Sequence, residues 1–172
     1  MIAINDFSSR RGVLVPLLPK FHAIIKENAK RDRVANLEPP EHVITWTQKM
    51  RKVILNINRR FVVAMDGENL VGILFYRAEN AGEKKIFIED LQTAWAYRNN
   101  PQIIDGFLKK LEYDQNTKDA TFYASERIKI DYDKELLASK GFKTVHEDGW
   151  ERLGTFSQAA GAIKIRYNRG MS

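Results

Sequence analysis

The chain has 172 residues, a length typical of one ordinary domain, and it contains no cysteine. Hydrophobic residues make up 44% of it and charged residues 29%, which excludes a wholly disordered or fibrous protein. The absence of cysteine excludes disulfides, zinc thiolate sites and thiol nucleophiles, and we expect a cytoplasmic location. The 28 Lys and Arg residues outnumber the 22 Asp and Glu residues, and the net charge of +6 favours an anionic partner.

The sequence predicts one soluble domain over residues 1–172 and no contact with a membrane. Met1 to Gly12 lacks the order of charges of a secretory signal, and no window approaches the roughly 20 apolar residues that a transmembrane helix needs. No repeat and no long linker divides the chain.

Two helices are predicted in the first third of the chain. After Pro16 and Pro19, which suit a helix start, apolar residues recur on one side up to about Arg31. A second helix follows the pair Pro39-Pro40. Its apolar positions are Val43, Ile44, Thr47, Met50, Val53, Ile54 and Ile57, whereas Lys49, Arg51, Lys52 and Asn56 face away.

The middle of the chain predicts a hairpin, a long strand and a third helix. Arg60 to Met65 and Leu70 to Tyr76 are joined by a turn in which Gly67 supplies a positive φ. Glu79 to Lys85 is expected to be a hairpin loop before a long strand, Ile86 to Tyr97. Asn99 or Asn100 can cap the helix that follows, with Pro101 at its first position and an apolar stripe of Ile103, Ile104, Phe107, Leu108 and Leu111.

The last third predicts short elements only. They are a strand at Ala120 to Ala124, a helix at Tyr132 to Lys140 that Gly141 can end, and strands at Phe142 to His146 and Ala162 to Tyr167. The resulting order of elements indicates an α/β domain with a mixed, mostly antiparallel central sheet flanked by helices.

This order of elements resembles the GNAT superfamily of acyl-CoA-dependent N-acyltransferases. The likeness covers roughly residues 12 to 167 and includes the hairpin Val62 to Tyr76, the long strand Ile86 to Trp95 and the sequence Lys140-Gly141-Phe142. It implies a GNAT-like fold, acetyl-CoA or a related acyl-CoA as co-substrate, and an amine of unknown identity as acceptor.

The resemblance also implies a cofactor site at the end of the long strand. There the backbone binds the pantetheine arm, and the loop into the next helix holds the pyrophosphate. The corresponding residues are Leu91, Thr93, Trp95, Arg98, Asn99, Asn100, Gln102, Ile103 and Ile104. Pro101 and Ile103 stand where the family motif Arg-x-x-Gly-x-Gly has glycine, which removes one amide and adds side-chain bulk beside the pyrophosphate. The amides of Gln102, Ile103 and Ile104 still point outwards from the helix start.

Direct aminolysis of a thioester needs a base for the amine proton and benefits from an acid near the leaving sulfur. Glu89 and Asp90 are adjacent on the predicted strand, so they are expected to face opposite ways, with Glu89 in the cleft as the base. Alternatively, both carboxylates are solvated or pair with lysines. The family's usual tyrosine acid corresponds to Leu137, and Tyr132, at the start of that helix, is the candidate in its place.

A second reading is a catalytically inactive GNAT-fold module that binds nucleic acid or a protein through its basic surface. Pro101, Ile103 and Leu137 favour this reading. The basic second helix and the tail could contact nucleic acid, with Trp46 or Tyr167 stacking on a base. The three histidines are predicted to lie at the surface or its boundary, and no ligand spacing indicates a metal. Serine hydrolase, P-loop and dinucleotide motifs are absent from the sequence.

Overall fold

The computed structural model of the chain describes residues 1–8, 10–34, 39–55, 59–79, 85–115, 121–124, 131–140, 142–145 and 163–167. Within these ranges the helices are α1 (Leu18–Arg31), α2 (Val43–Ile54), α3 (Pro101–Gln115) and α4 (Asp131–Ser139), with short 3-10 segments η1 (Arg11–Leu17) and η3 (Trp95–Tyr97). The strands are β1 (Ile2–Asp6), β2 (Arg59–Asp66), β3 (Asn69–Glu79), β4 (Lys85–Thr93), β5 (Thr121–Ala124), β6 (Phe142–Val145) and β7 (Ile163–Tyr167). None of the helices in these ranges has the length and apolar composition needed to cross a bilayer.

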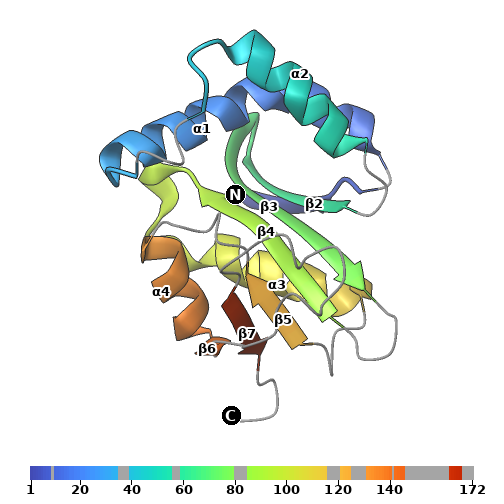
Figure 1. Cartoon of the computed structure of the whole chain (residues 1–172), viewed down its shortest axis with the longest axis vertical. Coiled ribbons are helices and arrows are strands. Elements are labelled where there is room, and N and C mark those ends of the chain that lie inside the picture. Colours follow the sequence, from blue (N-terminus) through green and yellow to red (C-terminus); the bar gives the residue numbers. More distant parts are fainter. Residues whose placement is uncertain are drawn as a thin grey trace.

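The described strands form one sheet in the order β1-β2-β3-β4-β5-β7-β6 (Figure 1). All neighbouring pairs are antiparallel except β4 and β5, which run parallel because α3 carries the chain from one to the other. The predicted fold class, a mixed and mostly antiparallel sheet flanked by helices, is therefore confirmed.

Both faces of the sheet are covered, and each has its own apolar core. Helix α3 packs on one face, where Tyr76, Ile88 and Phe107 are almost wholly buried. Helices α1 and α2 cover the other face around Phe21 and Phe75, whose rings meet edge to face at a centroid distance of 5.2 Å. Strands β2 and β3 contribute to both cores by alternation of their side chains.

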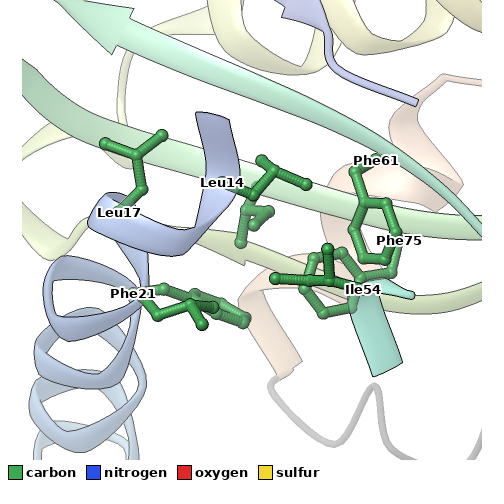
Figure 2. A pocket seen from close by; sticks show the side chains of 8 residues that line it. Leu14, Leu17, Phe21, Ile54, Phe61 and Phe75 are labelled. Atoms are coloured by element: carbon green, nitrogen blue, oxygen red, sulfur yellow. The ribbon is translucent and has the colours of Figure 1, made fainter. Parts of the chain in front are cut away.

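A cavity of about 10 Å³ lies in the second core, between η1, α1 and the sheet (Figure 2). Its lining is entirely aliphatic and aromatic, with side chains from Leu14, Leu17, Leu18, Phe21, Ile54, Phe61, Ile73 and Phe75. Such a space is at the lower limit for one water molecule and offers it no polar partner. It is a packing defect and not a site for a substrate.

The structure confirms most of the predicted elements and corrects several boundaries. The β2–β3 hairpin turns at Gly67 with φ of +61°, and the Asn100 side chain accepts the Gln102 amide at the start of α3, at 2.9 Å. The long strand ends at Thr93 and not at Tyr97, because Trp95 to Tyr97 turn into η3. Strand β1 was not predicted. The predicted loop residues 80–84 and the helix end at Gly141 lie outside the described residues.

The buried face of α2 differs from the predicted one. Trp46 is buried with Ile54, and its indole packs edge-on against Phe21 at 5.4 Å. Ile44, predicted to pack, has 71% of its surface exposed. His22 is also buried, with Nε2 2.8 Å from the Pro40 carbonyl, so its predicted surface position is wrong. The buried tryptophan fixes the rotation of α2, because one large aromatic ring buries more apolar area than a small aliphatic side chain.

Candidate functional site

Strand β4 extends beyond the described part of β5 (Figure 1). Its ladder with β3 continues to the pair Gly72–Thr93, whereas its ladder with β5 spans Lys85–Thr121 to Ile88–Ala124, the last described residue of β5. Among the described residues, the stretch 89–93 is paired with β3 alone.

A β-bulge interrupts β4 directly after its last described pair with β5. Phe75 pairs with Asp90 and Tyr76 pairs with Ile88, so Glu89 is an extra residue in the ladder. Ile88 and Leu91 both belong to the core under α3. Glu89 and Asp90, the two residues between them, therefore lie on the opposite face of the sheet, which α1 and α2 cover. The prediction that Glu89 and Asp90 face opposite ways is wrong, because the bulge breaks the alternation on which it depended.

Glu89 is buried and is held by an ion pair. Its Oε2 lies 2.6 Å from Nε of Arg59, and 8% of the residue is exposed. Arg59 lies on β2 two residues before Phe61, on the same face of the sheet. The alternative reading of a paired carboxylate thus holds for Glu89, with an arginine as the partner and not a lysine.

Asp90 belongs to a polar network that ties α1 to the end of β4. Its Oδ1 accepts the Leu91 amide at 2.9 Å and Nε2 of Gln92 at 3.1 Å. Nδ2 of the buried Asn28 in turn donates to Oε1 of Gln92 at 3.1 Å and to the Thr93 carbonyl at 2.9 Å. Asn28 Oδ1 is buried without a hydrogen-bond partner among the described residues. The amide of Leu91, which the resemblance assigns to the cofactor, is therefore already hydrogen-bonded.

Arg98 is enclosed by side chains from three elements. Its Nη1 donates to Oδ1 of Asp32 at 2.8 Å, and its Nη2 pairs with Oδ2 of the same carboxylate. The guanidinium lies 4.2 Å from the ring centroid of Trp95 and 4.9 Å from that of Tyr132. Arg31 stacks on Trp95 as well, at 5.0 Å. With its side chain 10% exposed, Arg98 joins α1, η3 and α4 and is not directed at solvent.

Tyr132 and Asp133, in the first turn of α4, complete this cluster. Asp133 is 2% exposed, and its Oδ1 has no hydrogen-bond partner among the described residues. Burial raises the pKa of the Asp133 carboxyl well above its usual range; the Arg98 charge opposes this shift, whereas Asp90 and Asp32 add to it. Burial also raises the pKa of Tyr132. The buried Asp133 carboxyl therefore favours its protonated form more strongly than an exposed aspartate does.

At the start of α3, backbone amides face solvent although this segment contains no glycine. The side chains of Ile103 and Ile104 are buried beneath the helix, and Cγ2 of Ile103 would lie 3.0 Å from a Cβ placed on Gly72. The expectation that Ile103 adds bulk beside a bound anion is wrong, because this side chain points into the core. Pro101 lacks an amide hydrogen, and the Asn100 side chain caps Gln102, which leaves the amide of Ile103 without an acceptor within the helix.

The other predicted site residues have mixed surroundings. Asn99 and Gln102 are exposed, Thr93 is buried, and Leu137 lies in the core under α3. The side chain of Tyr167 is outside the described residues, as is His146. Within the described ranges, no three His, Asp or Glu side chains gather in a metal-binding arrangement.

Sequence reasoning did not identify Asn28, Asp32 and Asp133 as members of this site. Asn28 and Asp32 are one helical turn apart at the end of α1, beside an apolar stripe, so their spacing alone put them on the packed side of the helix. Asp133 is four residues before Leu137 and shares its face of α4. The signal available in the sequence was an acidic residue, Asp133, on the apolar face of a predicted helix.

No family model matches the chain, and no curated protein sequence does. Solved structures do match it. PaiA N-acetyltransferase from Thermoplasma acidophilum, in complex with coenzyme A, has a TM-score of 0.63 at 15% identity, covering 96% of this chain and 97% of that one. A protein of the GNAT family from Desulfovibrio desulfuricans has a TM-score of 0.57 at 14% identity, covering 97% of each chain. An aminoglycoside acetyltransferase from an uncultured soil metagenomic sample, in complex with sisomicin, has a TM-score of 0.54 at 14% identity, covering 86% and 94%.

Proposed function

The chain has the GNAT fold, and from this premise we propose that it transfers an acyl group from acetyl-CoA, or a related acyl-CoA, to an amine. The observation that carries the proposal is the bulge in β4 with its two carboxylates, in a stretch of β4 that extends beyond the described part of β5. Two structural neighbours support it, because one contains coenzyme A and another contains an aminoglycoside.

In this proposal the acyl-CoA lies along the open edge of β4. The backbone from Leu91 to Thr93 receives the pantetheine arm, and the amide of Ile103 and the positive end of the α3 dipole face the pyrophosphate. Trp95, Asn99, Asn100 and Gln102 border this path. Arg98 contributes its backbone and its anchoring of η3, because its guanidinium is paired with Asp32.

The proposed reaction is a direct acyl transfer. The amine nitrogen attacks the thioester carbonyl, a C–N bond forms, and the C–S bond breaks to release the thiol. Glu89, directly or through a water molecule, takes the proton that the amine loses. Because the chain has no cysteine, a thiol-linked acyl-enzyme is excluded. The leaving thiolate needs a proton, for which Tyr132 was the candidate from sequence.

Calorimetric titration with acetyl-CoA tests the cofactor half of the proposal. We expect a micromolar Kd that weakens about tenfold in Gln102→Glu, since the added charge lies at the exposed start of α3 and repels the pyrophosphate. Gln48→Glu, the same change on the exposed face of α2, is the control and should bind normally. No heat at millimolar acetyl-CoA contradicts the proposal.

Release of free thiol tests the transfer itself. The cysteine-free chain gives no background with a thiol reagent, so coenzyme A can be measured directly. We expect turnover with at least one of a panel of primary amines that includes an aminoglycoside, a diamine and a peptide with a free N-terminus. Acetyl-CoA binding without turnover on any of them points to the second candidate.

The second candidate is a GNAT-fold module without catalysis, and specific contacts favour it. Arg98 and the Leu91 amide are occupied by Asp32 and Asp90, and the position of the family's acid is Leu137, in the core. Trp46 is buried and cannot stack on a base. The candidate contact surface is therefore the exposed basic group Lys49, Arg51 and Lys52 on α2.

Gel retardation with single-stranded DNA and RNA at low salt tests this module. We expect retardation that the double variant Lys49→Glu, Lys52→Glu abolishes, with acetyl-CoA binding unaffected. An unshifted nucleic acid at low salt contradicts this candidate.

A further inference from the structure

We propose that Asp133 is the acid that protonates the departing thiolate. This inference rests on the proposed acyl transfer and assigns the one step for which Glu89 provides no group. The proton on the Asp133 carboxyl passes to sulfur as the C–S bond breaks, and the carboxylate that results regains a proton from solvent after product release. Glu89 meanwhile takes the amine proton, so the products are an amide and a neutral thiol.

The position of Asp133 suits this role. It belongs to the first turn of α4, and α4 lies beside the end of β4 that extends beyond the described part of β5 (Figure 1). It interacts electrostatically with Asp90, which is next to Leu91 on the edge where the thioester arm is proposed to lie. Four residues later on the same helix face, Leu137 is packed in the core and has no proton to give.

The charges around Asp133 keep its proton in place. The facing charged groups are Arg98 from the turn before α3, Asp90 from β4 and Asp32 from α1, with Tyr132 next to it on α4. Arg98 is the cation among these four, and its guanidinium is engaged with both oxygens of Asp32. A carboxylate at Asp133 would be buried beside two others, with one oxygen unpaired, which strongly disfavours ionisation.

Tyr132 is less suited to donate the proton. Its ring packs on the Arg98 guanidinium at 4.9 Å, and burial raises its pKa above that of an ordinary tyrosine. A phenol of raised pKa is a weaker acid than a carboxyl whose pKa has moved towards neutrality. We therefore assign Tyr132 to positioning Arg98 and the first turn of α4.

The test compares two acyl donors that differ in the leaving thiol. Acetyl-CoA releases an alkyl thiolate, which needs protonation, whereas an acetyl 4-nitrothiophenyl ester releases a thiolate of much lower pKa that departs without it. We expect Asp133→Asn to lower kcat with acetyl-CoA by about 100-fold or more, and with the aryl ester by less than about 5-fold. The Kd of acetyl-CoA should stay within about 3-fold of wild type.

Controls separate this role from a structural one. Asp105→Asn, at an exposed carboxylate on α3, should lower kcat by less than about 5-fold with both donors. Equal losses with both donors in Asp133→Asn overturn the assignment, and so does a donor-dependent loss in Tyr132→Phe. Absence of wild-type turnover with any amine overturns the acyl transfer itself.

If the Asp133→Asn variant does not fold, the pH dependence of the wild-type protein tests the same assignment. Its kcat with acetyl-CoA should fall at high pH as Asp133 loses its proton, while kcat with the aryl ester shows no such fall. An identical pH profile for the two donors overturns the assignment.

Discussion

At the scale of single residues, the carboxylates of the site outnumber the cations that pair with them. Arg59 pairs with Glu89 and Arg98 pairs with Asp32, whereas burial raises the pKa of Asp133, whose Oδ1 has no hydrogen-bond partner among the described residues. The resemblance identified the position of Arg98 correctly but could not indicate its partner, because Asp32 lies 66 residues earlier in the chain. Glu89 was predictable as a candidate from its position on the strand. The face of the sheet on which it lies depends on the β-bulge, which no residue type in the sequence indicates.

The first prediction at this scale concerns stability and pH. Because the pKa of Asp133 is higher in the folded protein than in the unfolded chain, the folded state binds the proton more tightly, and stability falls as pH rises above about 4. Asp133→Asn should flatten this decline and raise the free energy of unfolding at pH 8 by about 1 to 3 kcal/mol. Urea denaturation between pH 4 and 9 measures it. A parallel decline in wild type and variant contradicts the shift.

The second prediction concerns the base. Glu89→Gln should lower kcat for amine acetylation by about 100-fold or more while acetyl-CoA still binds, since an amide accepts no proton at neutral pH. Steady-state kinetics and calorimetry measure the two effects, and Glu68→Gln, on the exposed hairpin turn, is the control. Unchanged turnover would remove Glu89 from the mechanism.

At the scale of elements, the helices α1 to α4 and all the described strands except β1 were predictable, including the short elements β5, α4, β6 and β7. Helices α1 and α3 and the β2–β3 hairpin have long apolar patterns and clear turn residues, so their type and approximate limits were predictable. Strand β1 has five residues with apolar side chains at Ile2 and Ile4 that are half-buried, too few for alternation to stand out. The buried face of α2 was predicted incorrectly because the periodicity of apolar residues gives Ile44 and Trp46 equal weight. In the folded protein the larger Trp46 ring is buried and Ile44 is exposed.

The third prediction concerns the contact between α3 and β1. A Cβ on Gly106 would lie 2.4 Å from Cγ1 of Ile4, so Gly106→Ala should destabilise the protein by about 1 to 3 kcal/mol. In an Ile4→Ala background the same change should become stabilising, by up to about 1 kcal/mol, because alanine favours a helix more than glycine does. A double-mutant cycle by urea denaturation measures the reversal. Equal effects in both backgrounds would contradict the close approach.

At the scale of the whole molecule, the order of elements predicted the fold class. That success has a physical basis, since the parallel crossover through α3 is the arrangement that joins the long strand to the following one within a single sheet. The arrangement of α1 and α4 around the end of β4 was not predictable, because it depends on side-chain contacts between elements about 100 residues apart.

The fourth prediction concerns cooperativity and the single predicted domain. The two apolar cores share β2 and β3, so they should unfold in one transition. Phe107→Ala in the core under α3 and Phe21→Ala in the core under α1 should each cost about 3 to 5 kcal/mol and lower the same Tm. Calorimetry with far- and near-ultraviolet circular dichroism measures this. Two transitions, each responding to one variant, would divide the chain into separate units.

The bulge in β4 has a consequence for how this site can change during evolution. Removing Glu89 altogether would bring Ile88 next to Asp90 and restore regular alternation, with Ile88, Asp90 and Leu91 keeping the faces they occupy now. A single in-frame codon deletion could therefore delete the proposed base without moving a core residue to the other face. The reverse insertion could add a carboxylate to a regular strand, so gain and loss of catalysis on this sheet are one codon apart.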